Sequence, residues 1–191
     1  MDKEKEKIIE KAGELCNEYR DKGFHCSEST IRAVADVLDI KLPEDLLRVS
    51  SVFRGGGGGY GERCGAVEAG LMLISYLYGR TDPEQDVSDY SYLARLLHDR
   101  YKEELGSYYC RVLLPFAYYL SGEEQHCGYV YRNGAKIVAR LLLEADELIA
   151  NMPEEEKAGY GEEDEKEKET KVNEKLKDDE QKYSDHKIKN G

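Results

Sequence analysis

Apolar residues recur at intervals of three and four through nearly all of residues 7–150, and no stretch shows a convincing strand-like alternation of apolar and polar residues. Such intervals place side chains on one face of an α-helix. The pattern therefore predicts an all-α fold, a single-domain bundle of about six or seven helices over residues 1–152. The length of 191 residues suits one hydrophobic core.

Prolines, glycines and capping residues divide this domain into helices. A proline is tolerated in the first turn of a helix but kinks or splits a helix that it interrupts, as we expect at Pro115. Gly79 is expected to end a helix in the left-handed conformation, and Asp82-Pro83 resembles a helix start. The expected helices cover about residues 7–23, 27–40, 42–53, 64–78, 83–105, 108–120 and 122–151, the last preceded by a capping box at residues 121–124.

Residues 153–191 differ in composition from the rest of the chain. They contain 14 acidic and 9 basic side chains and almost no aliphatic ones, so they cannot bury much apolar surface. We expect a charged tail that is disordered or forms a solvated helix. Residues 1–152 are acidic as well, with 26 acidic and 19 basic side chains, which disfavours binding to nucleic acid phosphates.

The sequence also indicates the cellular compartment of the protein and its relation to membranes. The charged residues 1–7 do not resemble a signal peptide, and the apolar stretch from Ala66 to Tyr78 contains Glu68 and is too short to span a bilayer. We expect a cytoplasmic protein without membrane insertion. Because the cytosol keeps thiols reduced, the five cysteines predict metal binding or redox chemistry rather than a disulfide framework.

Five consecutive glycines, residues 55–59, precede Cys64. No regular helix or strand would tolerate such a run, so we expect a loop. With no side chains in the way, its backbone amides could approach a sulfur atom or a cluster closely. The candidate contacts with a cofactor are Gly57, Gly58, Gly59 and Gly65.

The cysteines Cys26, Cys64, Cys110 and Cys127 each share a helix face with apolar residues, so we expect all four to face the core. Cys26 and Cys64 also lie at expected helix N-termini, where free N–H groups favour the thiolate that binds metal. Cys16 lies on an apolar face too, so this pattern alone does not separate a metal site from ordinary packing. The spacings of 38, 46 and 17 residues match no local ligand motif.

Two histidines directly precede cysteines of this set, His25 before Cys26 and His126 before Cys127. Zinc accepts both thiolate and imidazole ligands, so a mixed site is chemically reasonable. Adjacent helical residues rarely bind one ion together. We therefore expect these histidines to support a neighbouring thiolate or to lie on the surface.

The glycine run leading into Cys64-Gly65-Ala66, with one cysteine upstream and two downstream, resembles the C_GCAxxG_C_C family of redox-active proteins. The resemblance spans about residues 5–150. It implies an all-helical domain with four characteristic cysteines and a redox role. One departure is Ala69, which stands where the family motif has glycine, with Gly70 following it.

A similar domain accompanies haem in split-Soret cytochromes, where the cysteines hold an iron–sulfur centre. By this analogy Cys26, Cys64, Cys110 and Cys127 would ligate an iron–sulfur cluster, expected to be of the 2Fe–2S type. The chain has no C-x-x-C-H motif and thus no signal for covalently attached haem.

The resulting expectation is an electron-transfer protein with an unidentified redox partner and no defined substrate. Two alternatives stay open at this point. One is a thiol–disulfide oxidoreductase that cycles two of the cysteines, which requires an accessible thiol of low pKa. The other is a helical interaction domain with structural zinc or no metal. No residue decides the oligomeric state, and a homodimer also stays open.

Overall fold

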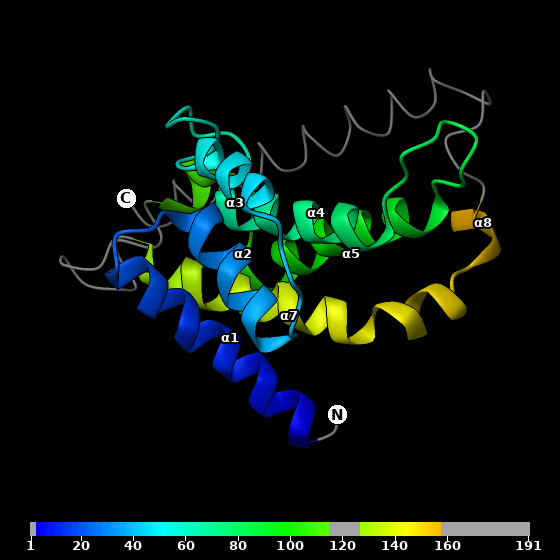
Figure 1. The fold of residues 1–191 in the computed structure, drawn as a ribbon, viewed down its shortest axis with the longest axis horizontal. Helices are drawn as coiled ribbons and strands as arrows, with labels where there is room; N and C mark the ends of the chain where they lie inside the picture. The colour runs from blue at the N-terminus through cyan, green and yellow to red at the C-terminus, as the bar shows by residue number, and fades with distance from the viewer. Residues whose placement is uncertain (1–2, 115–126, 158–191) are drawn as a thin grey trace, which may run out of the picture. The chain divides into compact units, whose positions relative to one another are not determined.

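The computed structural model describes residues 3–114 and 127–157, and within these ranges the chain is helical and contains no strand. The all-α prediction is therefore confirmed (Figure 1). The helices are α1 (Lys3–Asp21), α2 (Cys26–Val37), α3 (Glu44–Ser50), the 3₁₀ turn η1 (Ser51–Phe53), α4 (Gly65–Tyr78), α5 (Ser88–Leu105), α7 (Gly128–Ala150) and α8 (Glu154–Lys157). The predictions for Pro115, for residues 121–124, for His126 and for the tail beyond residue 157 lie outside the described residues.

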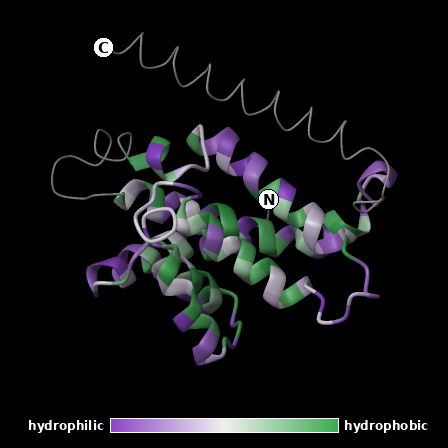
Figure 2. Cartoon of the chain, turned by 90° about the horizontal axis from the view of Figure 1, so that it is seen from above, coloured by the Kyte–Doolittle hydropathy of each residue, from purple (hydrophilic) through white to green (hydrophobic). Residues whose placement is uncertain are grey.

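The apolar helix α4 packs against α2, α5 and α7. Its position matches its composition, because the helix is apolar along most of its length, as Figure 2 shows. A Cβ added to Gly70 would stand 2.7 Å from Leu97 Cδ2 and 2.8 Å from Val138 Cγ2. Gly70 therefore permits a close approach of α4 to both α5 and α7, one position after the residue where the family motif has glycine.

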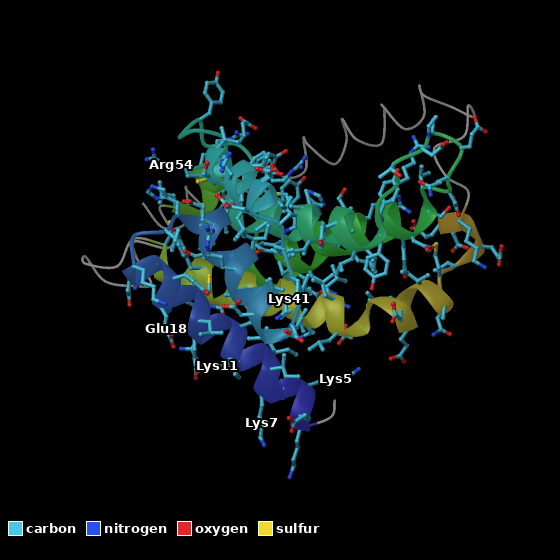
Figure 3. All side chains as sticks on the ribbon, in the orientation of Figure 1. Lys5, Lys7, Lys11, Glu18, Lys41 and Arg54 are labelled. Atoms are coloured by element: carbon cyan, nitrogen blue, oxygen red, sulfur yellow. The ribbon has the colours of Figure 1, made fainter. Side chains whose placement is uncertain are left out.

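Helix α1 covers α2 and α7 along one side. Ile9, Ala12 and Cys16 on its inner face are fully buried. Lys7 and Lys11 project from the outer face of α1 into solvent (Figure 3). The three-and-four spacing read from the sequence thus predicts the orientation of this helix correctly.

Two glycines end helices in different ways. Gly106 takes φ 80°, the left-handed conformation, and its N–H donates to the Lys102 carbonyl at the end of α5. Gly79 ends α4 with φ −71° and ψ 165°, an extended conformation. The prediction of a left-handed cap at Gly79 is therefore wrong, because the chain leaves α4 in the direction of the next loop without reversing.

The helix expected to begin at Pro83 begins later, at Ser88. The carboxylate of Asp82 accepts the N–H of Glu84 at 2.9 Å in a local turn instead of capping a helix. Asp86 Oδ1 accepts both the N–H (3.1 Å) and the hydroxyl (2.9 Å) of Ser88, which satisfies the start of α5.

The long helix expected from about residue 122 begins instead at Gly128. Cys127 has φ 58°, which no right-handed helix permits, so α7 cannot extend through it. At the other end, α8 follows α7 and contacts α5, where Ser88 Oγ donates to the Lys157 carbonyl at 2.9 Å. No helix in the two described ranges is both long and apolar enough to cross a membrane.

Candidate functional site

All four cysteines lie at the beginnings of helices. Cys26 is the first residue of α2, Cys64 directly precedes α4, and Cys127 directly precedes α7. Cys110 is the first helical residue of the segment 110–114. Figure 1 shows the beginnings of α2, α4 and α7 at the same end of the bundle. The sequence predicted a helix N-terminus for Cys26 and Cys64, and the helix expected over residues 108–120 placed Cys110 in its first turn. Cys127 was expected within the helix from about residue 122 and lies instead directly before α7.

Cys64 and Cys110 are brought together by a short antiparallel pairing of the backbone. The Cys64 N–H donates to the Tyr108 carbonyl at 2.8 Å, and the Cys110 N–H donates to the Glu62 carbonyl at 2.6 Å. Alternate residues of paired extended segments point to the same side. Cys64 and Cys110 therefore occupy diagonal positions on one side of this pairing, and charge on Cys110 raises the pKa of Cys64.

The sulfur of Cys26 lies directly against the backbone at Gly65. A Cβ added to Gly65 would overlap Cys26 Sγ and would stand 2.8 Å from the Phe53 carbonyl oxygen. The backbone N–H groups of Gly55, Ser27 and Gly65 all act on this sulfur and favour its thiolate. Gly65, one of the predicted contacts, thus faces a candidate ligand atom.

The glycine loop adopts a conformation that side chains would resist. Each glycine of the run 55–59 has a positive φ, from 60° at Gly55 to 95° at Gly59. Residues with a Cβ rarely adopt this region. Gly56 is buried, and a Cβ added to it would overlap the backbone nitrogen of Glu62. The glycine run therefore allows the chain to fold back on residues 61 and 62, directly before Cys64.

The three predicted cofactor contacts in the loop, Gly57, Gly58 and Gly59, have different surroundings. Gly58 donates its N–H to the Val52 carbonyl in η1 at 2.8 Å, and Gly59 donates its N–H to the Arg54 carbonyl at 3.0 Å. Gly57 is exposed, and a Cβ added there would meet nothing within 4 Å. The loop glycine whose amide acts on Cys26 is Gly55, which the sequence analysis did not single out from the run.

The four thiols lie close enough together to influence one another electrostatically. Burial is the largest cause of a raised pKa at each of them, and it raises the pKa of Cys127 to about 12. Charge on Cys26 also raises the pKa of Cys64, Cys110 and Cys127. Charge on Cys110 likewise raises the pKa of Cys64 and of Cys127. The four thiols therefore lie within electrostatic range of Cys26, as does Cys16, whose pKa charge on Cys26 also raises.

Backbone N–H groups at the helix N-termini lower the pKa of Cys26 and Cys64, but by less than burial raises it. The backbone N–H groups of Ala66 and Val67, in the first turn of α4, lower the pKa of Cys64, as amides do at Cys26. The net pKa of both thiols is nevertheless raised. Helix N-termini alone therefore do not make these cysteines thiolates, contrary to the simplest expectation from the sequence.

Cys16 lies next to this group without belonging to the helix-start arrangement. It is fully buried in the middle of α1, and its sulfur is 3.6 Å from the hydroxyl of Thr30, one turn after Cys26. Burial raises the pKa of Cys16 to about 12, and charge on Cys26 contributes to the increase. The apolar pattern could not distinguish this cysteine from the other four.

His25 precedes α2 and is exposed, and its backbone N–H donates to Glu28 Oε2 at 3.1 Å. Its main chain therefore helps to fix the helix start that carries Cys26. His126 lies outside the described residues. Within residues 3–114 and 127–157, no three His, Cys, Asp or Glu side chains are arranged to hold a single metal ion.

The donor set nevertheless fits a thiophilic centre. Cys26, Cys64 and Cys110 are buried, Cys127 is partly buried, and all four provide sulfur atoms. Sulfur-only ligand sets bind zinc and iron–sulfur clusters in preference to hard ions such as magnesium and calcium. If a cluster binds here, these four side chains would hold it.

Comparisons with known proteins place this arrangement in a family. No curated protein and no solved structure matches the chain. The family model described as "Putative redox-active protein (C_GCAxxG_C_C)" matches residues 24–141. This range contains the four cysteines at helix starts and the glycine loop, and it leaves out Cys16. The chain therefore belongs to the C_GCAxxG_C_C family of redox-active proteins.

Proposed function

We propose that this protein transfers electrons through one iron–sulfur cluster, of the 2Fe–2S type, ligated by Cys26, Cys64, Cys110 and Cys127. The observation that carries the proposal is that four helix N-termini each present a cysteine and that the four thiols are electrostatically coupled. An iron–sulfur cluster supplies a centre that accepts and releases one electron when bound.

Electrostatics support a cluster over free thiolates. Four thiolates around two ferric ions and two sulfides carry a net negative charge, which increases by one unit on reduction. Helix N-termini stabilise negative charge through their positive ends and free N–H groups. The amides of Gly55 and Gly65 at Cys26, and of Ala66 at Cys64, provide such groups. They should raise the reduction potential, because they stabilise the reduced state more than the oxidised state.

Burial argues against the oxidoreductase alternative. A thiol that attacks disulfides needs an accessible sulfur and a low pKa. Cys26, Cys64 and Cys110 are buried, and burial raises the pKa of each. A metal centre can still bind such thiols, because its positive charge takes the place of the released protons. The proposal includes a reducing compartment such as the cytoplasm, where free cysteines persist.

The test is to purify the full chain without oxygen, record its visible spectrum, and assay iron, acid-labile sulfide and zinc together. The proposal predicts roughly two iron and two sulfide ions per chain and a brown chromophore that dithionite bleaches reversibly. Stoichiometric zinc in a colourless protein would support a structural zinc site instead. A protein that holds neither metal and cannot be reconstituted with iron and sulfide would refute the cluster.

A further inference from the structure

Tyr101 has a buried hydroxyl without a hydrogen-bond partner. The side chain lies on α5 and is fully buried. Its oxygen is one of the few buried side-chain polar atoms in the described part of the chain that make no hydrogen bond. Because a buried, unsatisfied hydroxyl costs stability, a phenylalanine of the same shape would suit a purely structural position better.

The hydroxyl lies beside the start of α4. A Cβ added to Gly134 on α7 would stand 2.5 Å from the Tyr101 oxygen and 3.1 Å from Ala66 Cβ. Ala66 is the second residue of α4 and follows Cys64 by two positions. Two of the smallest residues, Gly134 and Ala66, therefore leave room for the hydroxyl next to the helix start that carries a candidate ligand.

The cysteines nearest to the start of α4 act on this hydroxyl electrostatically. Burial is the main cause of the strongly raised pKa of Tyr101. Charges on Cys64, Cys16, Cys26 and Glu104 follow in that order, so Cys64 is the charged group with the largest effect. A phenol is a hydrogen-bond donor, whereas a protonated thiol is only a weak acceptor. A sulfur that has lost its proton to a metal centre is a much better acceptor.

We propose that Tyr101 is a positioning residue whose hydroxyl donates a hydrogen bond to the sulfur of Cys64 when the site holds its cluster. This inference rests on the proposed function. The hydroxyl, which makes no hydrogen bond in the described part of the chain, is then the donor to the ligand sulfur in the loaded site. Hydrogen bonds to a ligand sulfur withdraw electron density from the cluster and raise its reduction potential.

The test compares Tyr101→Phe with Tyr78→Phe in both metal-free and loaded protein. Tyr78 serves as the control because its hydroxyl donates to Asp146 Oδ1 at 3.1 Å, a bond that joins α4 to α7. The inference predicts that Tyr101→Phe leaves the metal-free protein as stable as the wild type, or more stable, in urea unfolding. It also predicts a more negative reduction potential in the loaded Tyr101→Phe protein. Tyr78→Phe should lower the stability and leave the potential unchanged.

A second variant tests the geometry. Gly134→Ala places a Cβ against the Tyr101 oxygen and should displace the hydroxyl, so the potential should become more negative here too. In the Tyr101→Phe background, Gly134→Ala should shift the potential no further. The two effects therefore should not add.

The outcomes separate the two proposals. If the loaded wild type contains iron and sulfide but Tyr101→Phe has the wild-type potential, the inference about Tyr101 is wrong and the proposed function stands. A loss of metal-free stability in Tyr101→Phe as large as that in Tyr78→Phe would also overturn the inference, because the hydroxyl would then have a partner without the cluster. A wild-type protein that binds no cluster overturns both proposals.

Discussion

At the scale of single residues, Gly56 and Gly58 show that glycine serves two distinct purposes in the loop before Cys64. Both have a positive φ, 72° at Gly56 and 65° at Gly58. A Cβ at Gly56 would also overlap the backbone of residues 61 and 62, whereas a Cβ at Gly58 would meet nothing within 4 Å. Gly56 therefore needs both its conformation and its lack of a side chain, and Gly58 needs only its conformation.

Alanine substitutions at these two positions form a matched pair. We expect Gly58→Ala to lower the free energy of unfolding by about 1–2 kcal/mol, the cost of a left-handed conformation with a Cβ. Gly56→Ala should lower it by roughly a further 1–3 kcal/mol, because backbone atoms have to move. Urea unfolding of the metal-free proteins measures both effects. Equal losses at the two positions would show that the loop does not pack as described.

Cys127 is the second informative residue at this scale. It is one of two non-glycine residues with a positive φ in the described part of the chain. Such a conformation is costly for a residue with a side chain, and strain of this kind is often found at functional sites. The conformation places Cys127 at the start of α7 instead of within a helix, so it contributes directly to the shared arrangement of the four cysteines.

At the scale of elements, the close contact of α4 with α5 and α7 depends on Gly70. A Cβ at this position would stand 2.7 Å from Leu97 Cδ2 and 2.8 Å from Val138 Cγ2. We expect Gly70→Ala to lower the free energy of unfolding by about 1–3 kcal/mol, because well-packed cores resist added volume. Thermal or urea unfolding of the metal-free protein provides the measurement.

A double variant tests whether the cost at Gly70 comes from this contact. Leu97→Val shortens the side chain nearest to the added Cβ, so Gly70→Ala should cost less in the Leu97→Val background than alone. Strictly additive losses would contradict the packing explanation. Either variant should keep the cysteine site intact, since Gly70 lies well inside α4, away from the Cys64 end.

The elements differ in how well the sequence predicted them. The apolar faces of α1 and α4 and the beginnings of α2 and α4 follow from local patterns, which are present in the sequence itself. The pairing of residues 61–64 with residues 108–111 is not local, so no spacing rule could reveal that Cys64 and Cys110 lie at diagonal positions of one backbone pairing. The turns between residues 81 and 87 were also missed, because the choice between Asp82 and Asp86 as the cap depends on their surroundings.

At the scale of the whole molecule, the site results from two opposing effects that act on the same thiols. Burial in the bundle raises the pKa values, and amides at the helix starts lower them. The sequence analysis foresaw the second effect at Cys26 and Cys64. It could not weigh the first, because the depth of burial depends on how all the helices pack together. Burial outweighs the amides, so the metal-free protein holds neutral thiols.

This balance predicts how the stability of the metal-free protein depends on pH. The pKa of Cys16 rises from 9.0 to about 12 on folding. Below pH 9 the thiol is protonated in both the folded and the unfolded chain, and the full contribution to stability is present. As the pH rises from 9 towards 12, only the unfolded chain releases the proton, so the free energy of unfolding falls by about 1.4 kcal/mol per pH unit for this thiol.

The comparison that isolates this contribution is Cys16→Ala. Urea unfolding under reducing conditions between pH 8 and pH 11, roughly spanning the titration range of free thiols, should give a shallower loss of stability in the variant than in the wild type. Other buried groups titrate in the same range, which is why the difference between the two slopes matters. Identical slopes would show that Cys16 does not stay protonated in the folded protein.

The central claim is that the four cysteines at helix starts form the site and that Cys16 does not. The most direct measurement is the iron and sulfide content, with the visible spectrum, of five single alanine variants purified without oxygen in parallel with the wild type. These are Cys16→Ala, Cys26→Ala, Cys64→Ala, Cys110→Ala and Cys127→Ala. We predict that Cys16→Ala keeps the wild-type content and spectrum and that each of the other four loses most of both. Full iron and sulfide in any one of those four, or their loss in Cys16→Ala alone, would contradict this account.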